Sequence, residues 1–203
     1  ATTGLATYAL VQRAAAQRQT VRAEAEAETA KQTTKFLVDL FRISDPSEAR
    51  GNTVTAREML DKGAARIDAE LSRQPAIQAT LLDTVGTVYV GLGLYRQARP
   101  LLERAVGTRR RLLDSDPVAH SESLNHLGDV LTLQAEFAVA EQTFRESIEK
   151  LRVQPTGSAQ QAALARSLHG LGMALSNQGK LPEAEQQLRA ALAIQRALFG
   201  EVN

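Results

Sequence analysis

The sequence predicts an all-α protein, a solenoid of stacked helical hairpins preceded by one long N-terminal helix. Three observations predict it. One arrangement of large and small residues occurs three times at nearly constant spacing. Inside each copy, apolar residues recur three and four positions apart, which is the periodicity of one helix face. A turn signal then interrupts every copy at the same place.

The repeated arrangement is defined by nine positions in each copy. The glycines that mark the copies, Gly86, Gly128 and Gly172, lie 42 and 44 residues apart. A fixed period in this range is typical of a repeat array. The copies are Leu82, Val85, Gly86, Tyr89, Gly93, Tyr95, Ala98, Leu102 and Ala105; Leu124, Leu127, Gly128, Leu131, Ala135, Phe137, Ala140, Phe144 and Ser147; and Leu168, Leu171, Gly172, Leu175, Gly179, Leu181, Ala184, Leu188 and Ala191.

Each marker glycine falls inside an apolar helical stripe, where it costs about 1 kcal/mol relative to alanine. Its recurrence indicates that a second helix passes too close for a side chain. The turn follows at Gly93-Leu94, Ala135-Glu136 and Gly179-Lys180, and a second apolar stripe begins after it. Each copy is therefore expected to form a helix–turn–helix hairpin that buries its faces only by stacking on its neighbours.

The three copies resemble the tetratricopeptide repeat in their small, large and glycine positions. The usual period of that repeat is about 34 residues, and the longer spacing here resembles the variant found in kinesin light chains. The segments Asp116-Pro117-Val118-Ala119 and Leu198-Phe199-Gly200-Glu201 are similar to the linkers of that variant. The resemblance implies a superhelix that binds a protein or peptide in its concave groove, with no catalytic activity and no cofactor.

Composition narrows the function classes further. The 203 residues carry 24 basic and 23 acidic side chains, so the net charge of +1 gives no reason to expect nucleic acid or anionic lipid as a partner. The chain has no cysteine, and no two of its three histidines have the spacing of a helical metal site. The pair Gly91 and Gly93 follows no strand, so it does not form a phosphate-binding loop. We therefore expect no catalytic residues, metal site or cofactor site.

The chain divides into four segments. Residues 1–12 are uncharged and mildly apolar, and they form either a frayed helix start or the end of a membrane-spanning helix. Residues 13–44, rich in alanine, glutamate and arginine, predict a solvated helical connector. Residues 45–75 predict a degenerate capping hairpin, with a capping box at Thr55 and Glu58. Residues 76–203 contain the three hairpins, and we expect the whole to be part of a longer protein.

A second resemblance concerns the N-terminal half. The runs from Phe36 to Phe41, Ser44 to Pro46 and Thr55 to Ala64 look like the segment after the transmembrane helix of bacterial receptor-type serine/threonine protein kinases with C-terminal tetratricopeptide repeats. Leu92 to Tyr95 and Pro100 to Glu103 fit the same picture. This resemblance implies a parent kinase whose catalytic residues are not part of this sequence. It also implies a soluble domain tethered to a bacterial membrane, and the sequence does not decide on which side of the membrane this domain lies.

The candidate binding residues are those one step off the buried stripe of each first helix, which the repeat resemblance places in the groove. They are Asp83 and Thr87; Asn125, His126 and Asp129; and Arg166, His169 and Asn177, with Thr84, Val90, Glu122, Thr132, Met173 and Ser176 beside them. An amide such as that of Asn125 can both donate to and accept from an extended backbone. The alternatives are that these are ordinary solvated residues, and that the array is a ligand-free spacer or an oligomerisation scaffold.

Overall fold

The structure is a computed structural model, and it describes residues 12–13, 16–17, 20–21, 23–24, 27–36, 38–39, 55–112, 116–152 and 157–200. Two compact units, residues 1–54 and 55–203, can be separated. In the first unit every described residue is helical, in agreement with the predicted N-terminal helix. The predicted end of a membrane span falls almost wholly on residues 1–11, outside the described residues. Among the described helices, none combines the length and apolarity that a bilayer crossing requires.

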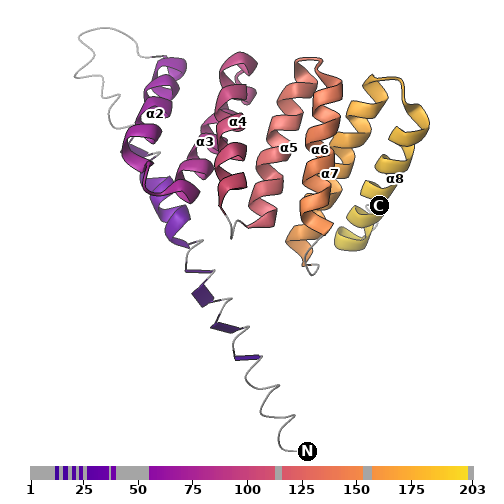
Figure 1. The fold of residues 1–203 in the computed structure, drawn as a ribbon, viewed down its shortest axis with the longest axis horizontal. Helices are drawn as coiled ribbons and strands as arrows, with labels where there is room; N and C mark the ends of the chain where they lie inside the picture. The colour runs from indigo at the N-terminus through magenta and orange to yellow at the C-terminus, as the bar shows by residue number, and fades with distance from the viewer. Residues whose placement is uncertain are drawn as a thin grey trace, which may run out of the picture. The chain divides into compact units, whose positions relative to one another are not determined.

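The second unit is a row of antiparallel helices. It contains α2 (Ala56–Leu71), α3 (Pro75–Gly91), α4 (Tyr95–Arg111), α5 (Pro117–Leu133), α6 (Phe137–Arg152), α7 (Ser158–Asn177) and α8 (Leu181–Phe199). Figure 1 shows them side by side in chain order. The described residues contain no strand. The pairs α3/α4, α5/α6 and α7/α8 are hairpins, so the predicted all-α solenoid is confirmed.

The helix α2 precedes the hairpins and is tied to the first of them. The Thr55 side chain accepts a hydrogen bond from the Glu58 backbone N–H, and the Glu58 carboxylate accepts one from the Thr55 N–H, so the predicted capping box is present. The fully buried Tyr89 of α3 donates its hydroxyl to Asp61 of α2 at 2.5 Å. Burial and this carboxylate raise the pKa of Tyr89. The connection through residues 45–54, predicted to belong to a capping hairpin, lies outside the described residues.

The marker glycines lie where the two helices of a hairpin touch. A Cβ atom built on Gly86 would be 2.8 Å from the Leu102 side chain, and one on Gly172 would be 2.7 Å from Leu188. These separations are far below an ordinary contact between carbon atoms. The expectation that glycine recurs because the second helix passes too close is therefore confirmed.

Each hairpin turns in the same way. The N–H of Leu94, Glu136 and Lys180 donates to the carbonyl oxygen five residues earlier, at 2.9, 2.8 and 3.0 Å. The residue before each donor has a positive φ, which is 72° at Gly93, 77° at Gly179 and 61° at Ala135. This is the Schellman arrangement that ends a helix with one left-handed residue. Ala135 is the exception in residue type, because its Cβ disfavours that conformation.

Charged side chains connect each hairpin to the next. They lie on or beside the second helix of each hairpin, and these second helices form the outer layer of the array. Arg110 of α4 donates to Glu146 of α6 at 2.9 Å and 2.5 Å, and Arg99 of α4 donates to Glu136 at the start of α6. Glu141 of α6 accepts from Lys180 at 2.8 Å. Hydrogen bonds from Lys180, Gln178 and Arg145 lower the pKa of Glu141 to about 2. These contacts join one hairpin to the next.

Helices α4, α5 and α7 have details that residue type alone does not indicate. Serine is a common cap at the start of a helix, but the cap of α5 is Asp116, and α7 begins at Ser158 after Gly157 without a side-chain cap. Ser121 lies inside α5 and is fully buried. Pro100 lies inside α4, which continues as one helix to Arg111.

Candidate functional site: the inner face of the first helices

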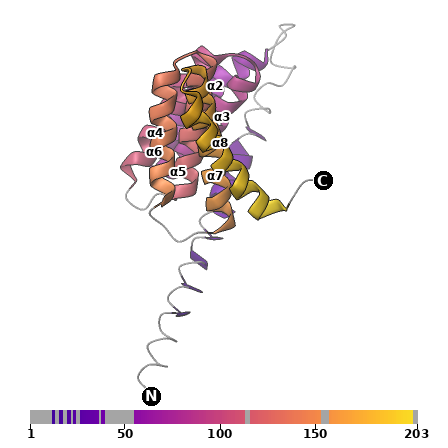
Figure 2. The same ribbon diagram turned by 90° about the vertical axis from the view of Figure 1, so that its right-hand side faces the viewer.

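The first helices of the hairpins form one layer of the array. The helix α5 packs against both α3 and α7, so α3, α5 and α7 are direct neighbours, whereas the second helices α4 and α6 are joined mainly by long charged side chains. Figure 2, viewed along the row, shows α4 and α6 on the same side. Closer spacing of the first helices makes their layer the inner side of the curve. We call the surface of α3, α5 and α7 the inner face.

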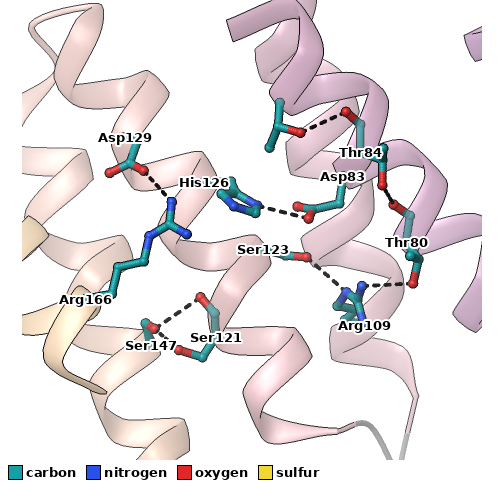
Figure 3. Close-up of polar contacts among 11 residues, drawn as sticks. Thr80, Asp83, Thr84, Arg109, Ser121, Ser123, His126, Asp129, Ser147 and Arg166 are labelled. Carbon is teal, nitrogen blue, oxygen red and sulfur yellow. Dashed lines mark hydrogen bonds and ion pairs between the residues drawn. The ribbon is translucent and has the colours of Figure 1, made fainter. Parts of the chain in front are cut away.

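Two of the predicted residues bind each other across the seam between α3 and α5. His126 of α5 lies with its Nδ1 atom 2.9 Å from Oδ2 of Asp83 in α3 (Figure 3). Both side chains are largely covered, at 13% exposure for Asp83 and 21% for His126. The other carboxylate oxygen of Asp83 is buried and has no hydrogen-bond partner. This pair therefore links two hairpins.

A second predicted pair lies across the seam between α5 and α7. Arg166 of α7 donates to Asp129 of α5 at 3.1 Å, as Figure 3 shows. The two side chains are about half exposed. Exposed ion pairs of this kind contribute at most about 1 kcal/mol, so this pair can be opened at little cost.

The sequence pattern did not indicate the role of Arg109, which lies in the last turn of α4. Its guanidinium extends from α4 to the inner layer, where it donates to Ser123 of α5 at 2.9 Å and to Thr80 of α3 at 3.2 Å. Burial lowers the pKa of Arg109, while the nearby Asp83, Glu122 and Asp116 act in the opposite direction. The sequence pattern does not indicate these contacts, because the hydroxyl groups of Ser123 and Thr80 lie on different helices and have no characteristic spacing along the chain.

Three serine hydroxyls meet in the core beneath the inner face. Ser147 of α6 is 2.5 Å from Ser121 of α5 and 2.8 Å from Ser167 of α7, measured between the Oγ atoms. All three are fully buried, and Ser167 also donates to the Ala163 carbonyl. Because every hydroxyl has a partner, the cluster joins three helices without an unsatisfied polar atom.

Asn125 behaves differently from the expectation of an open groove residue. It lies one turn after Ser121 on α5 and has no exposed surface. Neither its amide oxygen nor its amide nitrogen has a hydrogen-bond partner. A buried amide in this state costs about 1–3 kcal/mol. The side-chain amide of Asn125 thus makes no hydrogen bond with the described residues.

The remaining predicted residues lie at the surface. Thr87 is half-buried and donates to the Thr84 carbonyl at 2.8 Å, while Asn177 donates to the Met173 carbonyl at 2.9 Å. His169 is exposed, as are Met173 and Asn177 on the same helix. These three side chains follow one another at helical spacing, so α7 offers a strip with both apolar and polar groups.

One contact between a histidine and a carboxylate lies on the inner face. Asp83 and His126 are the one histidine–carboxylate pair found among the described residues, and no serine or threonine hydroxyl bonds to that histidine there. Within the described chain no group of three or more histidine, aspartate or glutamate residues could hold a metal ion.

The arrangement of the helices defines the class of fold. Stacked antiparallel hairpins with an inner layer of first helices form an α-solenoid. Models of the tetratricopeptide repeat family match residues 77–152 and residues 164–203, which cover most of the three hairpins. The chain is therefore a tetratricopeptide repeat protein.

A solved structure shows the same fold. The crystal structure of BtubC (BKLC) from P. vanneervenii is similar with a TM-score of 0.59 and 17% sequence identity, over 89% of this chain and 78% of that one. Two structures of a putative kinesin light chain with nearly identical repeats from Podosopora anserina, one of them a Q17M variant, are also similar. Their TM-scores are 0.46 and 0.45 at 17% identity, over 82% and 84% of this chain and 95% and 98% of theirs. Comparison with curated proteins finds no match.

Proposed function

We propose that the chain is a non-catalytic module that binds a protein or peptide along the inner face. Tetratricopeptide repeats generally serve protein–protein contact, which supports this assignment. The observation that carries the proposal is the strip on α7, where His169, Met173 and Asn177 are exposed in succession. A thioether that is 43% exposed between two polar side chains offers both apolar area and hydrogen bonds to a peptide.

The other candidate residues would act in different ways. The exposed Asp129–Arg166 pair can exchange its partners for charges of a ligand, because opening it costs little. The covered Asp83–His126 pair would instead hold α3 and α5 at fixed spacing beneath a ligand. Asn125 would contribute its amide only if the seam around it opened. Thr87 has its donor occupied and offers acceptor capacity only.

The test starts from a random peptide library selected on the 203-residue chain. Binding of the selected peptides is then measured by calorimetry for the wild type, Met173→Glu and His169→Ala. Each substitution should weaken binding at least about 10-fold, corresponding to about 1.4 kcal/mol. Val139→Glu on α6 is the matched control, since Val139 is 44% exposed and lies on the outer layer. Equal affinity of the wild type and Met173→Glu would refute binding at the inner face.

A structural spacer without ligand is the second candidate. It is favoured by one observation, namely that four of the predicted binding residues are already paired with each other across the seams. In a spacer these pairs serve to stiffen the array. Failure of the library to yield any peptide that the wild type binds more tightly than Met173→Glu would favour this candidate.

We further propose that the chain belongs to a bacterial serine/threonine protein kinase tethered to a membrane. The support is the sequence resemblance at residues 36–64 and 92–103. In such a protein the repeats would recruit a partner near the kinase, and the first residues would adjoin the membrane span. The test is the reading frame upstream of Ala1, where a glycine-rich loop, a strand lysine and a catalytic-loop aspartate are expected. An upstream frame without them would remove the kinase and leave the repeat assignment unchanged.

A further inference from the structure

The threonine hydroxyls of α3 and α5 on the inner face have already used their protons. Thr80, Thr84 and Thr87 of α3 and Thr132 of α5 each donate to a carbonyl oxygen of their own helix, at 3.1, 2.8, 2.8 and 2.8 Å. Figure 3 shows the bond from Thr84 to Thr80. A hydroxyl group has one proton to donate but two lone pairs that can accept. These four side chains therefore offer a ligand acceptors only.

Carboxylates on the same two helices add further acceptors. Glu122 of α5 is exposed and makes no hydrogen bond or ion pair with another described residue. Asp129 of α5 is 45% exposed, and Asp83 of α3 has a buried oxygen atom that accepts no hydrogen bond from the described chain. An ionised carboxylate accepts hydrogen bonds and cannot donate them.

The histidine between these helices adds one more acceptor. Because the Asp83 carboxylate can only accept, the Nδ1 atom of His126 is the donor in their 2.9 Å contact. In a neutral imidazole whose Nδ1 carries the proton, Nε2 is an acceptor. The contact with Asp83 thus leaves the His126 ring with a free acceptor rather than a free donor.

Arginines reach this surface from neighbouring helices, but their donors are engaged. Arg109 comes from α4 and donates to hydroxyl groups of α3 and α5. Arg166 comes from α7 and donates to Asp129. The whole chain has a net charge of +1, so the excess of carboxylates over α3 and α5 is a local feature. It includes Glu122, whose charge is exposed and unpaired among the described residues.

A buried amide at the same place gives a second, independent indication of a ligand. Asn125 lies on α5 three positions after Glu122 and four before Asp129, so the three share one helix face. Asn125 has no exposed surface, and neither of its amide atoms has a partner among the described residues. Asp83, with its unpartnered oxygen, stands at the equivalent place, three positions before the marker glycine. A buried polar group without a partner costs about 1–3 kcal/mol, and a bound donor would recover part of that cost.

We propose that the peptide segment bound by the inner face carries lysine or arginine side chains where it crosses α3 and α5. This inference rests on the proposed function and specifies the chemistry of its ligand. Ammonium and guanidinium groups have donors and no acceptors, so they complement a surface of acceptors. An acidic segment would bring like charge to Glu122 and acceptors to acceptors. Apolar side chains of the same peptide would lie on α7 at Met173.

The test compares two random peptide pools that are otherwise identical, selected on the 203-residue chain. One pool contains lysine and arginine but no aspartate or glutamate, and the other contains the acidic residues but not the basic ones. Calorimetry measures the affinity of the selected peptides. The tighter binders should come from the basic pool. The overall charge of the chain cannot cause this preference, because a net charge of +1 would favour the acidic pool.

Variants locate the contact. For peptides from the basic pool, Glu122→Lys should weaken binding about 10-fold and Glu122→Gln about 3-fold. Glu149→Lys is the matched control, because it makes the same charge change at an exposed position of α6 and should leave the affinity unchanged. Circular dichroism establishes that each variant is folded. Acetylation of the peptide lysines changes only the ligand, and it should weaken binding to the wild type at least about 10-fold.

The outcomes separate this inference from the proposed function. Acidic peptides that bind as tightly as basic ones, and that lose affinity in Met173→Glu, would overturn the basic preference and leave peptide binding at the inner face in place. Equal losses in Glu122→Lys and Glu149→Lys would also overturn it, because total charge would then decide the affinity. Selected peptides that bind Met173→Glu and the wild type equally would overturn both.

Discussion

The ring of Phe144 lies against two glycines on different helices, Gly128 of its own hairpin and Gly170 of the next. A Cβ atom on Gly128 would come within 2.5 Å of the ring, and one on Gly170 would be closer still. Phe144 itself is 1% exposed. One side chain thus fills the space inside the second hairpin and the seam to the third.

This relationship predicts the effect of Gly170→Ala. Although alanine favours a helix, the added methyl group has no room, and we expect a loss of about 1–3 kcal/mol in the free energy of unfolding. Gly107→Ala in α4 is the control, because its Cβ would lie 3.8 Å from the nearest side chain. That change should stabilise the protein by up to about 1 kcal/mol. Urea unfolding followed by circular dichroism measures both.

A second background distinguishes the steric clash with Phe144 from a general intolerance of α7 to substitution. In the Phe144→Leu background the smaller side chain leaves space for the methyl group, so Gly170→Ala should cost less there than in the wild type. Equal costs in the two backgrounds would show that Phe144 is not the cause.

The glycine pattern also shows how far the sequence reaches. Gly86, Gly128 and Gly172 could be recognised because they recur at the same place in each copy. Each of them is required by a close contact inside its own hairpin. Gly170 occurs in one copy only, because it leaves room for the ring of Phe144, which reaches it across a seam. Contacts that every copy repeats are visible in a single sequence, and contacts made once are not.

The same difference applies to the candidate site. Helical spacing was enough to place Asp83, His126, Asp129 and Arg166 on the first helices. Their mutual pairing depends on the rotation between successive hairpins, which no spacing encodes. Helical spacing likewise did not indicate that Asn125 has no exposed surface.

The two pairs on the inner face should differ in their response to salt. Double-mutant cycles of Asp83→Ala with His126→Ala, and of Asp129→Ala with Arg166→Ala, measure each coupling energy. We expect about 0.5–1.5 kcal/mol for the covered hydrogen bond and less than about 1 kcal/mol for the exposed ion pair. In 1 M NaCl the second coupling should vanish, because the screening length falls to about 3 Å. Equal salt sensitivity of both would mean that the first pair is solvated too.

The turn of the second hairpin offers a stabilising change. Ala135 has a φ of 61°, while glycine stands at the same place in the other two hairpins. A Cβ costs about 1–2 kcal/mol in this conformation, and the greater freedom of an unfolded glycine offsets part of that. Ala135→Gly should therefore raise the unfolding free energy by about 0.5–1 kcal/mol.

The reciprocal substitution is the control for this turn. Gly179→Ala should lower the stability, although a Cβ there would have no atom within 4 Å, so any loss comes from the backbone alone. Thermal and urea unfolding of both variants decide the matter. A destabilised Ala135→Gly would mean that the Ala135 methyl group contributes contacts that outweigh its strained backbone.

The stability of the array should fall in mild acid because of His120. This residue of α5 is 2% exposed, and its Nε2 atom has no hydrogen-bond partner. Burial lowers its pKa below the ordinary 6.5, and Lys150, Arg110 and Arg109 act in the same direction, while Glu146 opposes them. The folded protein therefore keeps His120 neutral at a pH where the unfolded chain binds a proton.

The sign of the effect follows from proton binding. Above about pH 7 neither state holds the proton, and His120 adds no pH dependence. As the pH falls through 6.5 toward the lower folded pKa, the unfolded chain gains a proton that the folded protein does not, so the unfolding free energy decreases by up to about 1.4 kcal/mol per pH unit. Urea unfolding between pH 7.5 and 5.5 should show this slope in the wild type. It should become flatter in His120→Gln and persist in His169→Gln, where the substituted imidazole is exposed. A slope that is unchanged in His120→Gln would assign the acid sensitivity to other groups.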